Sequence, residues 1–277
     1  MKAPGPLTGA NLRRTTGEAA PVIDRVTRLG FGAKGVVTIL IGGLALRYAL
    51  GKGGSITGPR GAIQSVLDEP LGVVILAVLA LGLVGYALWM FVAALLDPEG
   101  KGTGLPGLAE RIAFFVTGVG YALLAYATAN LLLGNGGGGS GTGLEDLAAF
   151  VLTPRVGRWL VGLAGAIVMA SGLLQLRLGI TGGFRESLRR GLGPVERAVT
   201  LVSGCVGYVT LGILSLLVGY SLIRVAVEYD PSEAGGWDEA LWLLSRLGEG
   251  LWLLGAVAIG LILYGVYFVL LVRYREL

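Results

Sequence analysis

The sequence predicts an all-α integral membrane protein whose six transmembrane helices form three parallel two-helix repeats in a pseudo-threefold bundle. Three observations predict this fold: an apolar composition, six long apolar stretches, and spacings that recur three times. Charged residues make up 14% of the 277 residues and apolar residues 54%, whereas a soluble domain carries roughly 25% charged residues. The mean hydropathy is +0.75. We therefore expect lipid, not water, to surround most of the chain.

Six stretches are long enough to cross a bilayer, which takes about 20 apolar residues. They cover residues 29–50, 71–96, 112–133, 159–180, 199–227 and 251–272. Grouped in pairs, they give repeat 1 over residues 26–100, repeat 2 over residues 108–184 and repeat 3 over residues 195–277, all in one membrane domain. Residues 1–25 contain prolines and polar groups but no apolar run, so we expect a poorly ordered cytoplasmic segment.

The repeats share spacings within their spans. At the entry of each odd-numbered span, an arginine stands seven residues before a glycine: Arg28 and Gly35, Arg111 and Gly118, Arg197 and Gly204. In the even-numbered spans, a glycine stands fourteen residues before a shared position: Gly72 and Tyr86, Gly157 and Ser171, Gly250 and Tyr264. Each unit has two spans, so all three copies insert with the same orientation and the symmetry axis lies along the membrane normal.

A third element precedes each even-numbered span at a constant offset. The stretches "GPRGAIQSVL", "GLEDLAAFVL" and "GWDEALWLLS" begin at Gly58, Gly143 and Gly236. Apolar residues at helical spacing predict short amphipathic helices on the outer surface, over residues 58–67, 144–152 and 237–245. The glycine-rich linkers before the first two follow no strand and lack a Gly-Lys-Ser/Thr signature. We therefore interpret them as flexible connectors and not as phosphate-binding loops.

The distribution of Lys and Arg predicts the orientation. The side that carries both termini and the second and fourth loops holds thirteen of these residues, and the opposite side holds six. Because cytoplasmic loops are the richer in Lys and Arg, both termini are expected in the cytoplasm. This topology accounts for the net charge of +4. We therefore expect membrane lipids as partners, anionic at the inner leaflet, and no nucleic acid.

The repeat pattern resembles the bacterial membrane family called domain of unknown function 1206. The resemblance rests on "RLGFGAKGVV", "ALRYALG", "GAIQSVL" and "LGLVGYALWMFVAALLDPEG" in repeat 1 and on the matching stretches of the other two repeats. It covers the chain from about Val26 onward. Repeat 1 departs from the pattern at Thr38, where repeat 2 has Tyr121. The resemblance implies a location in the bacterial cytoplasmic (inner) membrane and brings no activity with it.

The residue types argue against catalysis. The chain has no histidine, which excludes imidazole-ligated metal and haem sites and a histidine general base. No Asp or Glu falls within the six spans, and this disfavours proton-coupled or sodium-coupled transport. Cys205 is the only cysteine, so no intramolecular disulfide can form. We expect no enzymatic activity, no metal and no cofactor.

Polar side chains inside the spans are the remaining candidates for a site. They are Lys34, Arg47, Asn130, Gln175 and Arg177. One interpretation is that they reach the headgroups or bond a neighbouring helix, as long basic side chains near helix ends do. The other is that they face an interior cavity and attract an anionic solute or a lipid headgroup.

For Lys34 we expect the first interpretation to hold. Repeats 2 and 3 have Thr117 and Ser203 at the equivalent positions in this spacing, so the repeat tolerates a polar group there but does not require a charge. Lys34 is expected to extend its ammonium to the inner interface, and Lys34→Met to leave folding intact.

These observations favour a non-enzymatic integral membrane protein with a structural or interaction role. Two assemblies are compatible with this role: a homo-oligomer, and a complex with another membrane protein. The alternative is a passive channel or carrier for a small anionic solute along the pseudo-threefold axis. The two classes differ in whether the centre of the bundle is packed or wet.

Overall fold

The computed structural model describes residues 9–67, 69–97, 102, 104–134, 157–184, 193–228, 236–247 and 249–274. Its helices are α1 (Gly9–Ala49), α2 (Pro59–Leu67), α3 (Gly72–Leu96), α4 (Leu105–Leu132), α6 (Gly157–Thr181), α7 (Pro194–Glu228), α8 (Trp237–Ser245) and α9 (Gly250–Tyr274). Six of them are long and apolar enough to cross a membrane. The described ranges contain no strand. The chain is thus an all-α, multi-pass membrane protein, as predicted.

The predicted offsets within the repeats recur as helix boundaries. The second span of each repeat begins at its glycine and is 25 residues long: Gly72, Gly157 and Gly250 start α3, α6 and α9. The short helices α2 and α8 have nine residues each and begin thirteen residues before α3 and α9. The first and third predicted short helices are therefore confirmed as helices. The second, over residues 144–152, lies outside the described residues.

Both ends of α1 differ from the prediction. The helix extends back to Gly9, so residues 9–25 are helical where the sequence predicted a poorly ordered segment. Arg and Ala, which favour helix, each occur three times in this stretch. At the other end, Gly51 has a φ of +64°, and the amide of Lys52 donates to the carbonyl of Arg47 at 2.9 Å. The start of the first glycine-rich linker is thus a defined helix cap.

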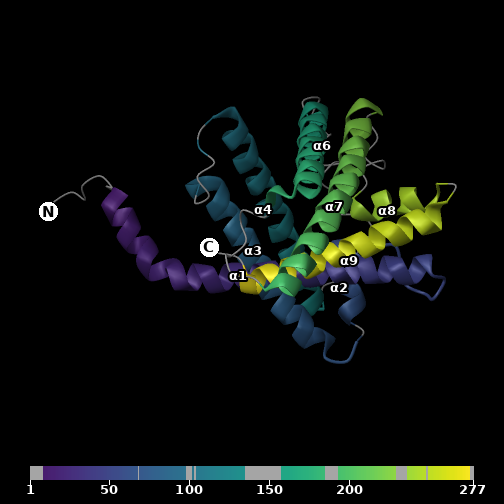
Figure 1. The fold of residues 1–277 in the computed structure, drawn as a ribbon, viewed down its shortest axis with the longest axis horizontal. Coiled ribbons are helices and arrows are strands. Elements are labelled where there is room, and N and C mark those ends of the chain that lie inside the picture. The colour runs from purple at the N-terminus through teal and green to yellow at the C-terminus, as the bar shows by residue number, and fades with distance from the viewer. Residues whose placement is uncertain are drawn as a thin grey trace.

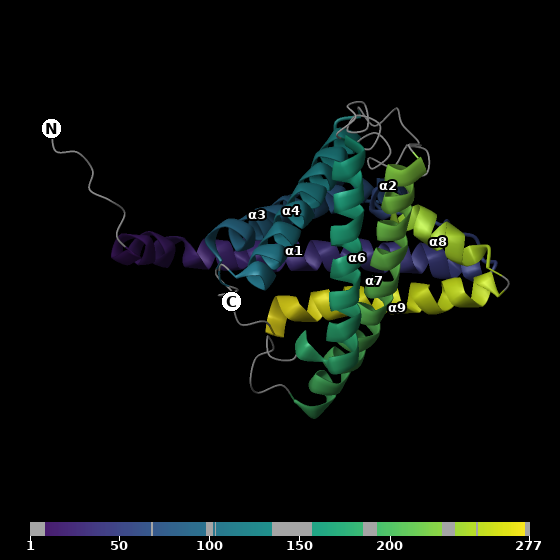
Figure 2. The same cartoon turned by 90° about the horizontal axis from the view of Figure 1, so that it is seen from above.

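The six spans pack as three pairs: α1 with α9, α3 with α4, and α6 with α7. Each pair joins the second span of one repeat to the first span of the next, and the α9–α1 pair closes the ring. The pairs cross one another steeply, with α1 and α9 lying across the view and α6 and α7 standing upright (Figures 1 and 2). Spans of the same repeat also pack in repeats 1 and 3, whereas α4 and α6 of repeat 2 hardly touch. The pseudo-threefold ring therefore has one open side.

Glycines set the register of these pairs. A Cβ on Gly35 of α1 would lie 2.8 Å from the carbonyl oxygen of Gly265 in α9. A Cβ on Gly212 of α7 would lie 2.9 Å from the carbonyl oxygen of Gly172 in α6. Gly265 and Gly172 both stand fifteen residues after the glycine that starts their helix. Gly35 and Gly212 therefore occupy equivalent places in repeats 1 and 3.

This equivalence corrects the predicted register of the third odd span. Gly212, and not Gly204, matches Gly35, so the position of the signature arginine in repeat 3 is Cys205 and not Arg197. Arg197 lies eight residues earlier, on an exposed face of α7. The physical reason is that the glycine is required where two backbones meet, whereas an arginine seven residues before a glycine also occurs elsewhere.

The arginines of repeats 1 and 2 have a common role at the ends of the pairs. Arg28 donates from Nη1 to the carbonyl of Val272, near the end of α9. Arg111 donates from Nε to the carbonyl of Ala94 at 2.7 Å and from Nη2 to that of Leu95 at 2.9 Å, at the end of α3. The last carbonyls of a helix have no partner within it and carry partial negative charge. Each arginine thus caps the preceding repeat and ties it to the next.

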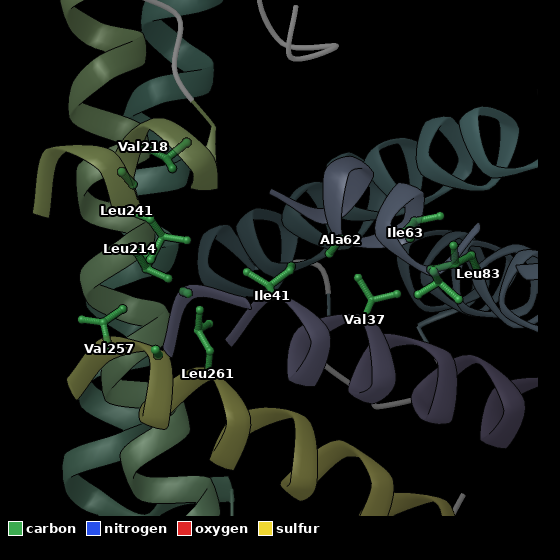
Figure 3. Close-up of a cluster of buried hydrophobic side chains, with 14 of the residues drawn as sticks. Val37, Ile41, Ala62, Ile63, Leu83, Leu214, Val218, Leu241, Val257 and Leu261 are labelled. Atoms are coloured by element: carbon green, nitrogen blue, oxygen red, sulfur yellow. The ribbon is translucent and has the colours of Figure 1, made fainter. Parts of the chain in front are cut away.

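The interior of the described domain is an apolar core to which all six spans contribute. Figure 3 shows Val37 and Ile41 of α1 beside Ala62 and Ile63 of α2 and Leu83 of α3. The same cluster continues through α7, α8 and α9 by way of Leu214, Val218, Leu241, Val257 and Leu261. A second cluster of buried residues is mainly aromatic and lies between α1, α3, α7 and α9. Lys34 lies beside this second cluster.

Candidate functional site

Lys34 stands inside the membrane domain on the buried face of α1, where two close helix contacts surround it. The neighbouring Gly35 lets α9 approach, because its missing side chain would otherwise meet the Gly265 carbonyl. On the preceding turn, a Cβ on Gly30 would lie 2.6 Å from the backbone nitrogen of Tyr86, so α3 approaches just as closely. The glycines of α1 therefore bring side chains of both α3 and α9 within reach of Lys34.

Four aromatic rings enclose the ammonium group of Lys34. The ring centroids of Phe268, Tyr86, Tyr121 and Tyr264 lie 4.2, 4.9, 5.6 and 5.6 Å from Nζ. Nζ also donates a hydrogen bond of 2.9 Å to the hydroxyl oxygen of Tyr86. The rings come from α3, α4 and α9, so spans of all three repeats meet at this point. We call these four residues the aromatic box.

The rings of the box support one another. Tyr86 and Tyr121 pack edge to face with centroids 4.5 Å apart, and Tyr264 and Phe268 lie at 4.8 Å. Phe31 of α1 bridges the two halves, at 5.6 Å from both Tyr86 and Phe268. Aromatic pairs of this geometry stabilise beyond the area they bury. The box is thus a rigid feature formed by four helices.

The electrostatics of the box suit a cation. Each ring carries negative charge on its face, which attracts an ammonium within about 6 Å. Lys34 is 9% exposed, so little water competes with the rings, and the attraction is stronger than at a surface. The tyrosine hydroxyl adds a polar acceptor. The site can hold one primary ammonium group and orient it by the hydrogen bond to Tyr86.

The expectation that Lys34 extends to the inner interface is wrong. Its ammonium points into the box, where the helix contacts bring four rings and a hydroxyl close to Nζ. Thr38, one turn further along α1, bonds back to the Lys34 carbonyl at 2.8 Å.

The other predicted polar residues do not join Lys34. Arg47 is exposed at the end of α1, beside the turn at Gly53. Gln175 of α6 accepts a hydrogen bond from Ser215 of α7 at 3.3 Å. Asn130 is half-buried on α4, and Arg177 is exposed on α6. These candidates lie on three different helices, and the structure brings none of them to the box.

Sequence reasoning missed the box residues as a site. Tyr86 and Tyr264 stood out only as a shared repeat position, fourteen residues into the second spans, and Tyr121 only as the residue that repeat 2 has where repeat 1 departs from the pattern at Thr38. Phe268 was not singled out. The signal that could have found the box is the coincidence of Lys34, early in the first span, with the tyrosines at one repeat position, Tyr86 and Tyr264. Among the described residues, no group of three side chains suited to a metal ion occurs.

Comparison with known proteins identifies the family of the chain. The family "Domain of Unknown Function (DUF1206)" matches three segments of the chain, residues 29–97, 112–182 and 206–275. The third segment starts next to Cys205, in agreement with the corrected register. A relative from Bacillus subtilis (strain 168), "Uncharacterized protein YxxB", is 33% identical over 225 residues, which cover 81% of each chain. No solved structure matches the chain.

Proposed function

The chain belongs to the DUF1206 family, and we propose that it is a non-enzymatic structural or interaction component of the bacterial cytoplasmic membrane. The observation that carries this proposal is the packed interior of the described domain, where the buried charge of Lys34 is held by aromatic rings of three helices. A conduction pathway needs polar groups along a continuous space. Here the described interior is built mainly of aliphatic and aromatic contacts.

The placement of the polar residues also favours a scaffold over a channel. An anion pathway along the axis would bring Lys34 together with Arg47, Asn130 or Gln175. Instead Arg47 is exposed, Gln175 pairs with Ser215, and Asn130 lies on α4 away from the box. The positive charge that would attract an anion is directed toward ring faces, which attract cations.

The absence of catalytic chemistry in the sequence supports the non-enzymatic part of the proposal. With no histidine in the chain, a catalytic base would have to be a carboxylate, a thiolate or an amine. The one amine inside the domain is enclosed by the box. Several serine and threonine hydroxyls of the spans bond back to their own helices, as Thr117 does to Ala113 and Thr128 to Leu124.

An anion-flux measurement tests the proposed function. The full chain is reconstituted in vesicles loaded with chloride, and efflux is followed after dilution. We expect efflux no faster than from protein-free vesicles, because aliphatic and aromatic side chains fill the interior of the described domain. Efflux that depends on the protein and is lost in Lys34→Met would show a lysine-lined pathway and would overturn the scaffold proposal.

Orientation is the second part of the proposal. Arg28, at the start of the first span, bonds the end of the last span, and Arg111 bonds the end of α3. These contacts support one common side for the arginine-rich ends, which we propose is the cytoplasm.

Single cysteines at Lys101 and Gly137, in a chain with Cys205→Ala, test the orientation. An impermeant thiol reagent added to intact cells should label the cysteine at position 137 and spare that at position 101. The reverse pattern of labelling would invert the topology.

A further inference from the structure

We propose that the aromatic box is a binding site for a primary ammonium ion in its own right, and that Lys34 is its tethered ligand. The box contacts the charged end of the lysine side chain, with four ring centroids within 5.6 Å of Nζ and one hydroxyl oxygen at 2.9 Å. This inference concerns binding and stands apart from the proposed scaffold role.

The chemistry of the box defines the ligand class. Ring faces attract any cation of this size, including a quaternary ammonium. The hydroxyl of Tyr86 accepts a hydrogen bond from the ligand, and a quaternary ammonium has no N–H to give. A guanidinium is planar and broader than the compact ammonium. The site therefore fits a primary alkylammonium.

The internal repeat supplies an independent argument. Gly207 of α7 meets Tyr264 as Gly30 of α1 meets Tyr86: a Cβ at either glycine would lie 2.6 Å from the tyrosine backbone. Leu211 follows Gly207 by four residues, as Lys34 follows Gly30. Leu211 is buried in the same aromatic cluster, 7% exposed. A lysine at position 211 should thus reach the Tyr264 hydroxyl in the same way as Lys34 reaches the Tyr86 hydroxyl.

The second repeat offers no such position. Thr117 is the equivalent of Lys34 there, but the residue that matches Tyr86 and Tyr264 is Ser171, which has no ring. Moreover, α4 and α6 hardly touch, so Ser171 does not face Thr117 as Tyr86 faces Lys34. Only positions 34 and 211 should therefore be able to deliver an ammonium to the box.

The first experiment removes the tether and supplies the ligand from solution. Lys34→Ala deletes three carbons and the nitrogen, which together correspond to n-propylammonium. Thermal unfolding of the purified full-length variant in detergent is followed with increasing n-propylammonium, with 1-propanol as the neutral analogue. We expect n-propylammonium at ten times its Kd to lower the unfolding equilibrium constant about tenfold. The parent chain and Lys34→Met, whose boxes are filled, should show no such response.

Two results of this experiment would overturn the proposal. Equal stabilisation by 1-propanol would mean that the space left by the lysine is an apolar cavity with no preference for charge. An equal response of the parent chain would place the n-propylammonium effect outside the box.

The second experiment moves the lysine within the chain and also covers the case in which Lys34→Ala does not fold. The double variant Lys34→Leu/Leu211→Lys should recover most of the thermal stability lost by Lys34→Leu. The matched control, Lys34→Leu/Thr117→Lys, should not recover it, because position 117 lacks the facing tyrosine. Recovery in neither variant, or in both equally, would contradict the box as an ammonium site.

Discussion

Replacing Tyr86 by phenylalanine removes the hydroxyl that accepts the Lys34 hydrogen bond at 2.9 Å and leaves the ring in place. A hydrogen bond from a charged donor contributes about 1.5–3 kcal/mol. Water cannot replace the lost acceptor easily, since Lys34 is only 9% exposed. We expect Tyr86→Phe to lower the free energy of unfolding by about 2 kcal/mol.

The magnitude depends on the charge and can be isolated with a double-mutant cycle. Lys34→Met removes the charge together with its interactions, so we expect it to cost no more than about 1 kcal/mol, as for other buried charges replaced by apolar groups. In that background, Tyr86→Phe should change the free energy of unfolding by less than about 0.5 kcal/mol. The two residues should therefore be coupled by about 1.5–2 kcal/mol.

The assay is reversible unfolding of the purified full-length chain in mixed micelles with increasing SDS, followed by circular dichroism. Tyr126→Phe is the matched control, because Tyr126 is 68% exposed on α4 and its hydroxyl has no role in the box. A coupling energy below about 0.5 kcal/mol, which is within the usual error of additivity, would show that the ammonium does not reside at the Tyr86 hydroxyl. That result would refute the reasoning and return Lys34 to the interface.

Two further predictions test the helix contacts by the same unfolding assay. Gly35→Ala should lower the free energy of unfolding by about 1–3 kcal/mol, because its Cβ would lie 2.8 Å from the Gly265 carbonyl oxygen, whereas Gly43→Ala, which has open space around it, should be neutral or stabilising. Similar effects of the two would argue against the close α1–α9 contact. Arg111→Met should lower the free energy of unfolding by about 1–2 kcal/mol through loss of the α3 cap. Arg197→Met should leave the free energy of unfolding unchanged. The opposite order would restore the sequence-based register of repeat 3.

The fold could be predicted from the sequence because its main signals are local or strictly periodic. A span can be recognised by the length of its apolar stretch. The second span of each repeat begins at the glycine that the fourteen-residue spacing identified. The short helices over residues 59–67 and 237–245 followed from the same offsets. The predicted register of the third odd-numbered span was wrong. An arginine and a glycine seven residues apart satisfied the pattern at Arg197, while the contact that matters is made by Gly212.

The sequence by itself determined the six spans, the threefold repetition and the presence of a lysine, Lys34, inside the first span. The tertiary structure alone decided where that charge goes. Residues of α3, α4 and α9 meet at Lys34 through glycine contacts, and sequence distance gives no measure of which helix faces approach closely. A lysine side chain is long and flexible, so its direction follows from the nearest favourable partner, and only the packed helices show that this partner is the aromatic box and not the membrane surface.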